Sequence, residues 1–203
     1  MTFTLFRFAG FTTRARQLLA ALVCGALISA PISASAGSLT GTYILKPGKI
    51  DTDFSVRVLG RGPVTGKFTN VSGKMVLNQN NPAKSRVNVV VDLASVRTDS
   101  DRVTGFLKSS AMFHVEKYPS AVFQSTRVKI TGKTTAIVEG VLTMRGQRKR
   151  TNFTVNILGN QSNGQVAFEV SGGFFRSLYG MDAGLPIYAD RVDLKISGSG
   201  QRG

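Results

Sequence analysis

From residue 53 onward, the chain alternates between apolar and polar residues with a period of two. Phe54, Val56 and Val58 share one face of the first such segment, whereas Ser55 and Arg57 share the other, which is typical of a half-buried β-strand. Segments of this kind recur with turn-forming Gly, Asn and Pro between them. The expected strands cover residues 53–58, 64–68, 74–78, 86–93, 121–130, 134–144, 150–158, 166–172 and 191–197. Eight or more short strands with tight connections predict an antiparallel barrel or sandwich.

The alternation breaks between residues 94 and 119. Ser100 and Asp101 can cap a short helix, and Val103, Phe106 and Leu107 fit helical spacing better than strand spacing. After the last strand, residues 198–203 are expected to form a frayed tail. If the sheet closes, its exposed edges disappear. The interior of an eight-stranded barrel is then either filled by its own side chains or able to hold one small ligand.

The first 36 residues have the pattern of a secretory signal peptide. Arg7, Arg14 and Arg16 precede an apolar run over residues 18–28, and small residues follow at Ala34 and Ala36. The run is short for a membrane span, which needs about 20 residues. We therefore expect cleavage after residue 36 and export of residues 37–203 as one domain, with an uncleaved anchor as the alternative.

The residue inventory argues against catalysis and against a metal site. The chain of 203 residues has one Cys and one His. Cys24 lies within the predicted signal peptide, and His114 is the single histidine available to activate a nucleophile. We therefore expect no catalytic residue, no metal ligand and no enzymatic activity.

Positive charge is the strongest bias in the composition. Lys and Arg number 26 against 11 Asp and Glu, a formal net charge of +15. The basic cluster over residues 145–150 lacks interleaved aromatic residues and belongs to a chain with an export signal, so a nucleic-acid partner is not expected. We interpret the cluster as a solvated turn or a contact with anionic lipid.

Apolar residues carry the remaining information. Nine of the 13 Phe follow residue 36, and periodicity alone favours a core filled by these rings. A set of segments favours a hollow interior over this filled core, because of what the set resembles. In chain order, it comprises residues 43–47, 54–60, 64–68, 94–98, 106–109, 112–119, 123–126, 140–149, 176–181 and 190–192. Together these segments resemble the YceI-like family of bacterial periplasmic lipid-binding proteins.

The resemblance implies an all-β fold, an extended eight-stranded antiparallel lipocalin-like barrel with a short helical insertion. It also implies a long apolar tunnel that holds an isoprenoid or another amphiphile for binding, transport or storage. The sequence departs from the family pattern at Lys46 to Ile50, where the family usually has Asp-Pro-x-His-Ser, and at Val58, where it has His. Lys46 and Lys49 could favour an anionic head group, with a solvated strand end as the alternative.

From strand parity and the resemblance, we predict a set of ligand contacts. They are Phe54, Val56, Phe106, Leu107, Phe123, Phe174, Arg176, Tyr179 and Met181. The leading hypothesis is a non-catalytic periplasmic carrier or store of an isoprenoid or quinone-like lipid, with that lipid as its ligand and no other cofactor. The alternative is a secreted stress-response or structural barrel with a filled core, whose basic surface binds anionic envelope components. The oligomeric state stays open, and a homodimer is one alternative.

Overall fold

The computed structural model describes residues 38–160 and 163–203, so the predicted signal peptide lies outside the described residues. Eleven strands are described: β1 (Gly41–Leu45), β2 (Ile50–Val58), β3 (Arg61–Phe68), β4 (Val71–Leu77), β5 (Arg86–Asp92), β6 (Val96–Arg97), β7 (Ser120–Ile130), β8 (Thr135–Met144), β9 (Gln147–Asn160), β10 (Gln165–Phe175) and β11 (Tyr188–Arg202). The described helical segments are α1 (Asp101–Lys108) and the 3₁₀ turns η1 (Pro82–Lys84), η2 (Leu93–Ser95) and η3 (Arg176–Tyr179).

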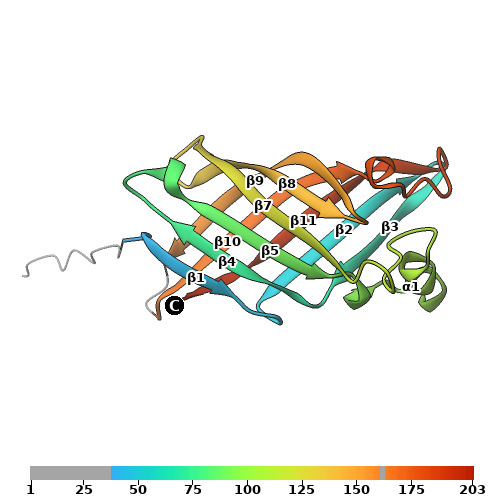
Figure 1. The fold of residues 1–203 in the computed structure, drawn as a ribbon, viewed down its shortest axis with the longest axis horizontal. Coiled ribbons are helices and arrows are strands. Elements are labelled where there is room, and N and C mark those ends of the chain that lie inside the picture. The colour runs from blue at the N-terminus through green and yellow to red at the C-terminus, as the bar shows by residue number, and fades with distance from the viewer. Residues whose placement is uncertain (1–37, 161–162) are drawn as a thin grey trace, which may run out of the picture. The chain divides into compact units, whose positions relative to one another are not determined.

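The eleven described strands occupy only eight positions in the sheet. β1 and β2 follow one another along β11, and β4 and β3 pair with them in turn. β5 and β6 then continue along β4 and β3. Every pairing is antiparallel, and the pairing of β1 with β11 closes the sheet into the barrel seen in Figure 1. The prediction of a closed eight-stranded antiparallel barrel with one short helix is confirmed.

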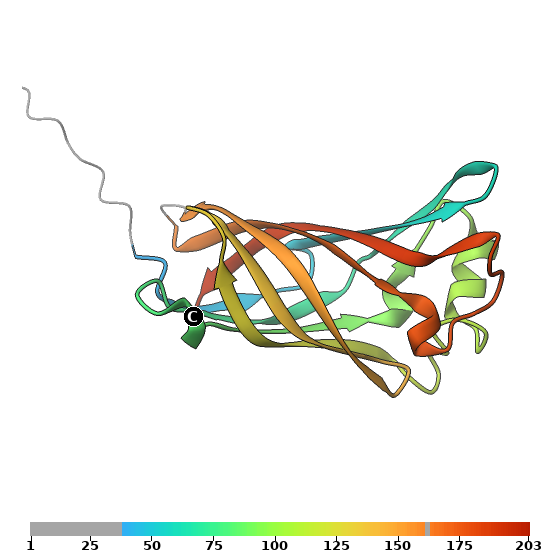
Figure 2. The same ribbon diagram turned by 90° about the horizontal axis from the view of Figure 1, so that it is seen from above.

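The connections between strands divide into two groups at opposite ends of the barrel. We define the helix end by the β2–β3 turn, the segment 98–119 that contains α1, the β8–β9 turn, and the segment 176–187 that contains η3. We define the loop end by residues 38–40, the β4–β5 loop with η1, the β7–β8 turn, and the last residues of β11. Figure 2 shows α1 and η3 together at one end and the C-terminus at the other.

The short helix forms where its capping residues predict. The Ser100 side chain accepts a hydrogen bond from the Val103 amide at 3.4 Å, and Asp101 lies in the first turn, where a carboxylate favours the free amides. Successive helical residues point about 100° apart. Leu107 is therefore buried against the barrel while Phe106 is 47% exposed. No helix among the described residues is long and apolar enough to span a bilayer.

The expected frayed tail is wrong. β11 continues through residues 198–202, where Tyr43 pairs with Arg202 and Ile44 with Gln201. The Arg202 guanidinium also donates to the Tyr43 hydroxyl at 3.0 Å and to the Thr40 carbonyl at 3.1 Å. A Gly- and Ser-rich segment gives no local strand signal, but here the neighbouring strand supplies its hydrogen-bond partners. These residues close the barrel.

Candidate ligand-binding cavity

A cavity of about 590 Å³ runs inside the barrel. This volume lies within the range of pockets that hold small molecules, about 300–1,000 Å³. The expected alternation places every second residue of three strands on its wall. These residues are Val87, Val89 and Val91 of β5, Phe153, Val155 and Ile157 of β9, and Val192, Leu194 and Ile196 of β11. The barrel is therefore hollow and largely apolar inside, and its own side chains do not fill it.

The exposure of the lining residues shows which end is open. At the loop end, Ile130 and Leu158 line the cavity and are 53% and 56% exposed. At the helix end, Leu107, Arg176 and Met181 also line it, and all three are buried. We call the loop end of the cavity the mouth and the helix end the floor. A long ligand can therefore enter at the mouth and extend towards the floor.

Arg176 holds the floor together. Its side chain is buried, and its guanidinium donates to the carbonyls of Ala183 at 2.9 Å, Tyr188 at 3.0 Å and Ala189 at 3.1 Å, and also to that of Met181. Burial lowers the pKa of Arg176, an effect that Asp190 and Asp182 oppose. Because most of its donors are already used, Arg176 ties the 181–189 segment across the floor.

Arg145 makes a second link across the same end. Its guanidinium donates to the Gly180 carbonyl at 2.8 Å and to the Ser110 carbonyl at 3.2 Å, and it also bonds the Met112 carbonyl. These carbonyls belong to the segment after α1 and the segment after η3. Arg145 therefore joins two connections that are far apart in sequence, and it is not available as a free surface cation.

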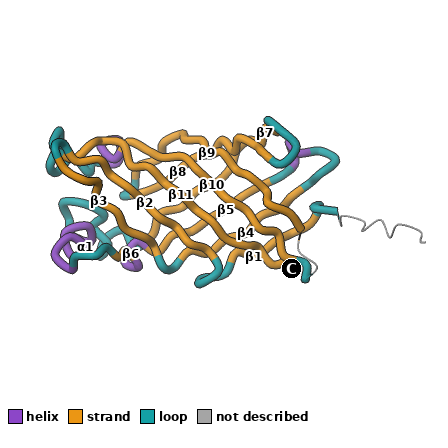
Figure 3. Tube along the Cα trace, turned by 180° about the vertical axis from the view of Figure 1, so that it is seen from behind, coloured by secondary structure: helices purple, strands orange, loops and turns teal. Residues whose placement is uncertain are grey.

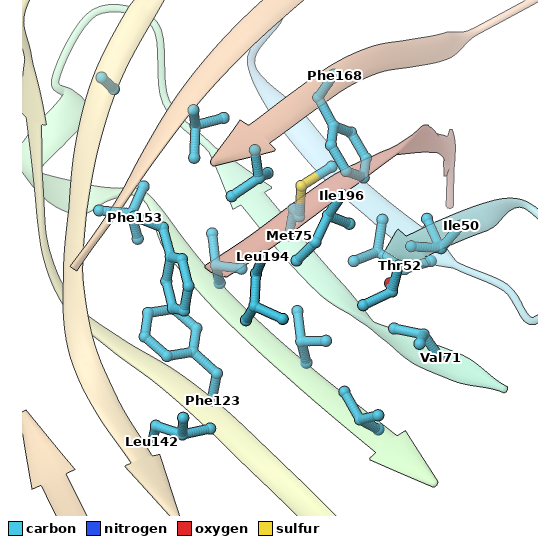
Figure 4. A pocket seen from close by; sticks show the side chains of 18 of the residues that line it. Ile50, Thr52, Val71, Met75, Phe123, Leu142, Phe153, Phe168, Leu194 and Ile196 are labelled. Atoms are coloured by element: carbon cyan, nitrogen blue, oxygen red, sulfur yellow. The ribbon is translucent and has the colours of Figure 1, made fainter. Parts of the chain in front are cut away.

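Two rows of aromatic rings shape the wall. The rings of Phe54, Phe68 and Phe113 form a row that leads towards the floor, with 5.7 Å between the ring centroids of each neighbouring pair. In the middle of the bore, Phe123 and Phe153 meet edge to face at 5.1 Å, as Figure 4 shows. Such pairs contribute about 0.5–1.5 kcal/mol beyond their buried area.

A glycine makes room for one of these rings. Gly140 lies in β8, between β7 and β9, and a Cβ there would come within 2.5 Å of the Phe123 ring and of the Gln124 carbonyl. Any side chain at this position would push the ring away from the wall. The absence of a side chain at Gly140 therefore determines how Phe123 lies against the wall of the bore.

Between the mouth and the floor, the hydroxyl of Thr52 interrupts the apolar wall. Thr52 lies on β2 opposite Phe68 and Ile196, is 3% exposed and lines the cavity. Its hydroxyl has no hydrogen-bond partner among the described protein atoms. Figure 4 shows it between Ile50 and Val71. Sequence reasoning missed Thr52, although it shares the parity of Phe54 and could have been found by extending that face towards the N-terminus.

Seven of the nine predicted contact residues line the cavity: Phe54, Val56, Leu107, Phe123, Phe174, Arg176 and Met181. The structure places the other two elsewhere. Phe106 points away from the bore because its helical neighbour Leu107 occupies the inner face. Tyr179 is buried behind the wall, edge to face with Phe174 at 5.6 Å, and burial raises its pKa to about 12.

Polar residues gather at the mouth, and sequence reasoning singled out none of them as lining residues. The β4–β5 loop, the β7–β8 turn and the first residue of β8 contribute them, and the two loops have no period from which a lining position could be predicted. They are Asn78, Gln79, Ser85, Lys133, Thr134 and Thr135. Lys133 is the cation of this set, and it is exposed to solvent. These side chains can meet the head of an amphiphile whose tail lies in the bore.

The remaining sequence candidates lie away from the bore. His114 packs edge to face with Tyr118 at 5.8 Å, and among residues 38–160 and 163–203 no group of His, Cys, Asp and Glu could hold a metal ion. Lys46 and Lys49 are exposed between β1 and β2. The basic cluster 145–150 lies at the helix end, opposite the mouth.

Comparison with known proteins gives the same family. The family model of the YceI-like domain matches residues 43–199. A UPF0312 protein of Photorhabdus laumondii is 30% identical, over 92% of this chain and 98% of its own length, and one of Serratia proteamaculans is 30% identical over 74% and 80%.

Solved structures share the fold at lower identity. BcnA of Burkholderia cenocepacia has a TM-score of 0.70 and 20% identity, covering 76% of this chain and 98% of its own. A polyisoprenoid-binding domain from Saccharophagus degradans has a TM-score of 0.64 and 16% identity, covering 79% and 98%. With a hollow apolar barrel, a family match over most of the chain and relatives of nearly equal length, the chain belongs to the YceI-like family.

Proposed function

We propose that the protein binds a long-chain lipid in its barrel and serves as a non-catalytic carrier or store of it. The observation that carries this proposal is the apolar cavity of about 590 Å³, whose lining residues are exposed at the mouth and buried at the floor. Burial of apolar surface contributes roughly 25 cal/mol per Å² and needs no fixed geometry. A flexible hydrocarbon tail therefore gains affinity along the whole bore.

The proposed ligand is an isoprenoid or quinone-like amphiphile. The Saccharophagus relative, described as a polyisoprenoid-binding domain, supports this class through its shared fold. The mouth adds polar side chains and one cation, Lys133, which suit a polar or anionic head. In this arrangement, the tail extends past Phe123 and Phe153 towards Leu107 at the floor.

We place this activity in the periplasm. The N-terminal sequence has the order of a cleavable signal peptide, and residues 37–203 contain no cysteine. Such a domain is held by its core and by sheet closure, without disulfides. The open cavity counts against the filled-core alternative, in which the interior could not accept a tail.

The test is to purify the protein from its native envelope without detergent and to extract it with organic solvent. Mass spectrometry should then find one lipid at a stoichiometric ratio. The delipidated protein should also take up an added prenol or quinone, measured by native mass spectrometry. A protein that emerges empty and refuses both added lipids would contradict the proposal.

A further inference from the structure

The charges of the barrel are unevenly distributed along its axis. The described segments of the loop end and the strand ends beside them contain Lys84, Arg86, Lys129, Lys133 and Arg202, all exposed, and no Asp or Glu. The nearest acidic residues of β8 and β10 are Glu139 and Glu169, each the fifth residue of its strand counted from this end. Among the described residues, the one ion pair joins Arg191 and Asp193, so none of these five cations has an acidic partner.

The opposite end has a mixed charge. At the helix end, cations such as Arg61, Lys108 and Arg148 are interspersed with acidic residues. Those acidic residues are Asp99, Asp101, Glu116, Asp182 and Asp190. The protein is therefore basic overall, but only the loop end presents positive charge alone. This difference depends on the fold, because the five cations of the loop end are spread over residues 84–202 of the sequence.

Four of these cations belong to neighbouring elements. η1, which ends at Lys84, packs against β7, which carries Lys129 and leads into the turn with Lys133. Figure 3 shows η1 beside the end of β7, at the end opposite α1. Arg86 begins β5, the strand that pairs with β7. The cations therefore form a cluster beside the mouth.

Apolar residues lie at the same rim. Ile130 ends β7 and Leu158 lies near the end of β9, and both are more than half exposed while also lining the cavity. The apolar surface of the bore thus continues onto the outside of the protein. Exposed aliphatic side chains beside lysines are the combination that binds an anionic bilayer, through shallow apolar insertion and attraction to lipid head groups.

We propose that the mouth end docks on the surface of an anionic lipid bilayer, with the opening of the bore against the membrane. Lys84, Lys129 and Lys133 contact the lipid head groups, and Ile130 and Leu158 insert beside them. Arg86, whose guanidinium donates to the Ala83 and Ser85 carbonyls, adds positive charge next to them. The proposal rests on the lipid-binding function proposed above, and it supplies a route by which a tail enters the bore without crossing water. The basic cluster 145–150 then faces away from the membrane.

Vesicle binding tests the location of the docking face. The purified protein, with its N-terminus established by mass spectrometry, is sedimented with vesicles of phosphatidylcholine alone or mixed with phosphatidylglycerol. Each cation near an anionic membrane contributes about fivefold to binding, so K129Q/K133Q should weaken binding to the anionic vesicles by about 25-fold. R148Q/R150Q removes the same charge from two exposed residues at the helix end and should leave binding near its original level.

Equal losses in the two double variants would overturn the proposal, because binding would then follow net charge alone. Absence of binding to the anionic vesicles at low salt would also overturn it. Binding that is strong at low salt and lost at high salt is the expected result, since exposed charges are screened over about 10 Å at ordinary ionic strength. Ile130→Ser should weaken binding at low salt, because it removes one of the aliphatic side chains that insert beside the lysines.

The orientation has its own measurement. Because Cys24 is the only cysteine, a C24S background allows single labels at Thr131→Cys in the β7–β8 turn or at Ala111→Cys at the helix end. An environment-sensitive fluorophore should shift to the blue on anionic vesicles at residue 131 and not at residue 111. A shift only at residue 111, or equal shifts at both, would overturn the docking proposal.

This experiment also separates docking from lipid carriage. The fluorescence test uses delipidated protein and does not require an occupied bore. If residue 131 responds but the bore takes up no prenol or quinone, the docking face stands and the carrier function fails. If the bore fills but residue 131 does not respond, the carrier function stands and the docking proposal fails.

Discussion

Replacing Thr52 by Val tests the description of the bore most directly. The Thr52 hydroxyl is buried, and 3% of the residue is exposed. It has no hydrogen-bond partner among the described protein atoms. Leaving a buried hydroxyl unpaired costs about 1–3 kcal/mol relative to leaving it in water. Val has nearly the same shape and fits the apolar surroundings of Ile50 and Val71. We therefore expect T52V to stabilise the delipidated protein by about 1 kcal/mol, because the unpaired group is removed without making a void.

The assay is thermal unfolding of delipidated protein followed by circular dichroism. For a domain of this size, a gain of about 1 kcal/mol raises Tm by about 2–4 °C. T151V is the matched control, because the Thr151 hydroxyl donates to the Gly173 carbonyl at 3.2 Å and does not line the cavity. Its loss should destabilise the protein by about 0.5–1.5 kcal/mol. If T52V lowers Tm as T151V does, the Thr52 hydroxyl has a partner in the protein and the reasoning is refuted.

Three further variants probe the bore, the floor and the wall. Leu194→Trp narrows the middle of the bore and should weaken prenol uptake by about tenfold, since about 60 Å² of tail left unburied costs about 1.5 kcal/mol. Its control is Lys195→Trp, which places the same ring on the exposed face of β11. Equal uptake of prenol by the two variants would contradict a ligand in the bore. Arg176→Met leaves buried carbonyls unpaired and should lower the free energy of unfolding, measured in urea, by about 3–5 kcal/mol. A change below about 1 kcal/mol would show that Arg176 does not hold the 181–189 segment in place. The folded pKa of Tyr179, raised to about 12, lies above its unfolded value, so the stability that Tyr179 contributes is present below about pH 10 and is lost as pH rises towards 12. Tyr179→Phe should remove part of that loss of stability, and an unchanged slope between about pH 10 and 12 would show that Tyr179 ionises freely in the folded protein.

Basic side chains have different roles at the floor and at the mouth. At the floor, Arg176 and Arg145 are used by backbone carbonyls, so their positive charges hold the closed end together. At the mouth, Lys129 and Lys133 are exposed, without an acidic partner among the described residues. Basic side chains therefore serve structure at the floor, whereas the lysines at the mouth are available for recognition.

The sequence alone predicted most of the strands and most of the wall, and the family resemblance implied the barrel. Alternation with a period of two is a local property, so Phe54, Val56, Phe123 and Leu194 could be assigned to the inner face before any strand was paired. The cap at Ser100 is equally local, and it placed α1 correctly. The prediction of a signal peptide in residues 1–36 stays a prediction, because it lies outside the described residues.

Local patterns fail where a neighbour in space decides the outcome. Residues 198–202 became a strand because β1 pairs with them, and Phe106 pointed outward because Leu107 took the buried face of α1. Tyr179 is buried but does not line the cavity, since it lies in a 3₁₀ turn, whose period of about three residues differs from the strand period of two. Arg176 was predicted as a ligand contact, but only the folded segment after it supplies the carbonyls that it binds.

Which end of the barrel is open was decided by tertiary structure alone. Lys84, Lys129, Lys133 and Arg202 are dispersed through the sequence, and only the antiparallel closure of the sheet gathers them at one end. The hollow interior has the same origin. A side chain's parity tells which face it occupies, whereas the space left between opposite walls depends on how eight strand positions close around it.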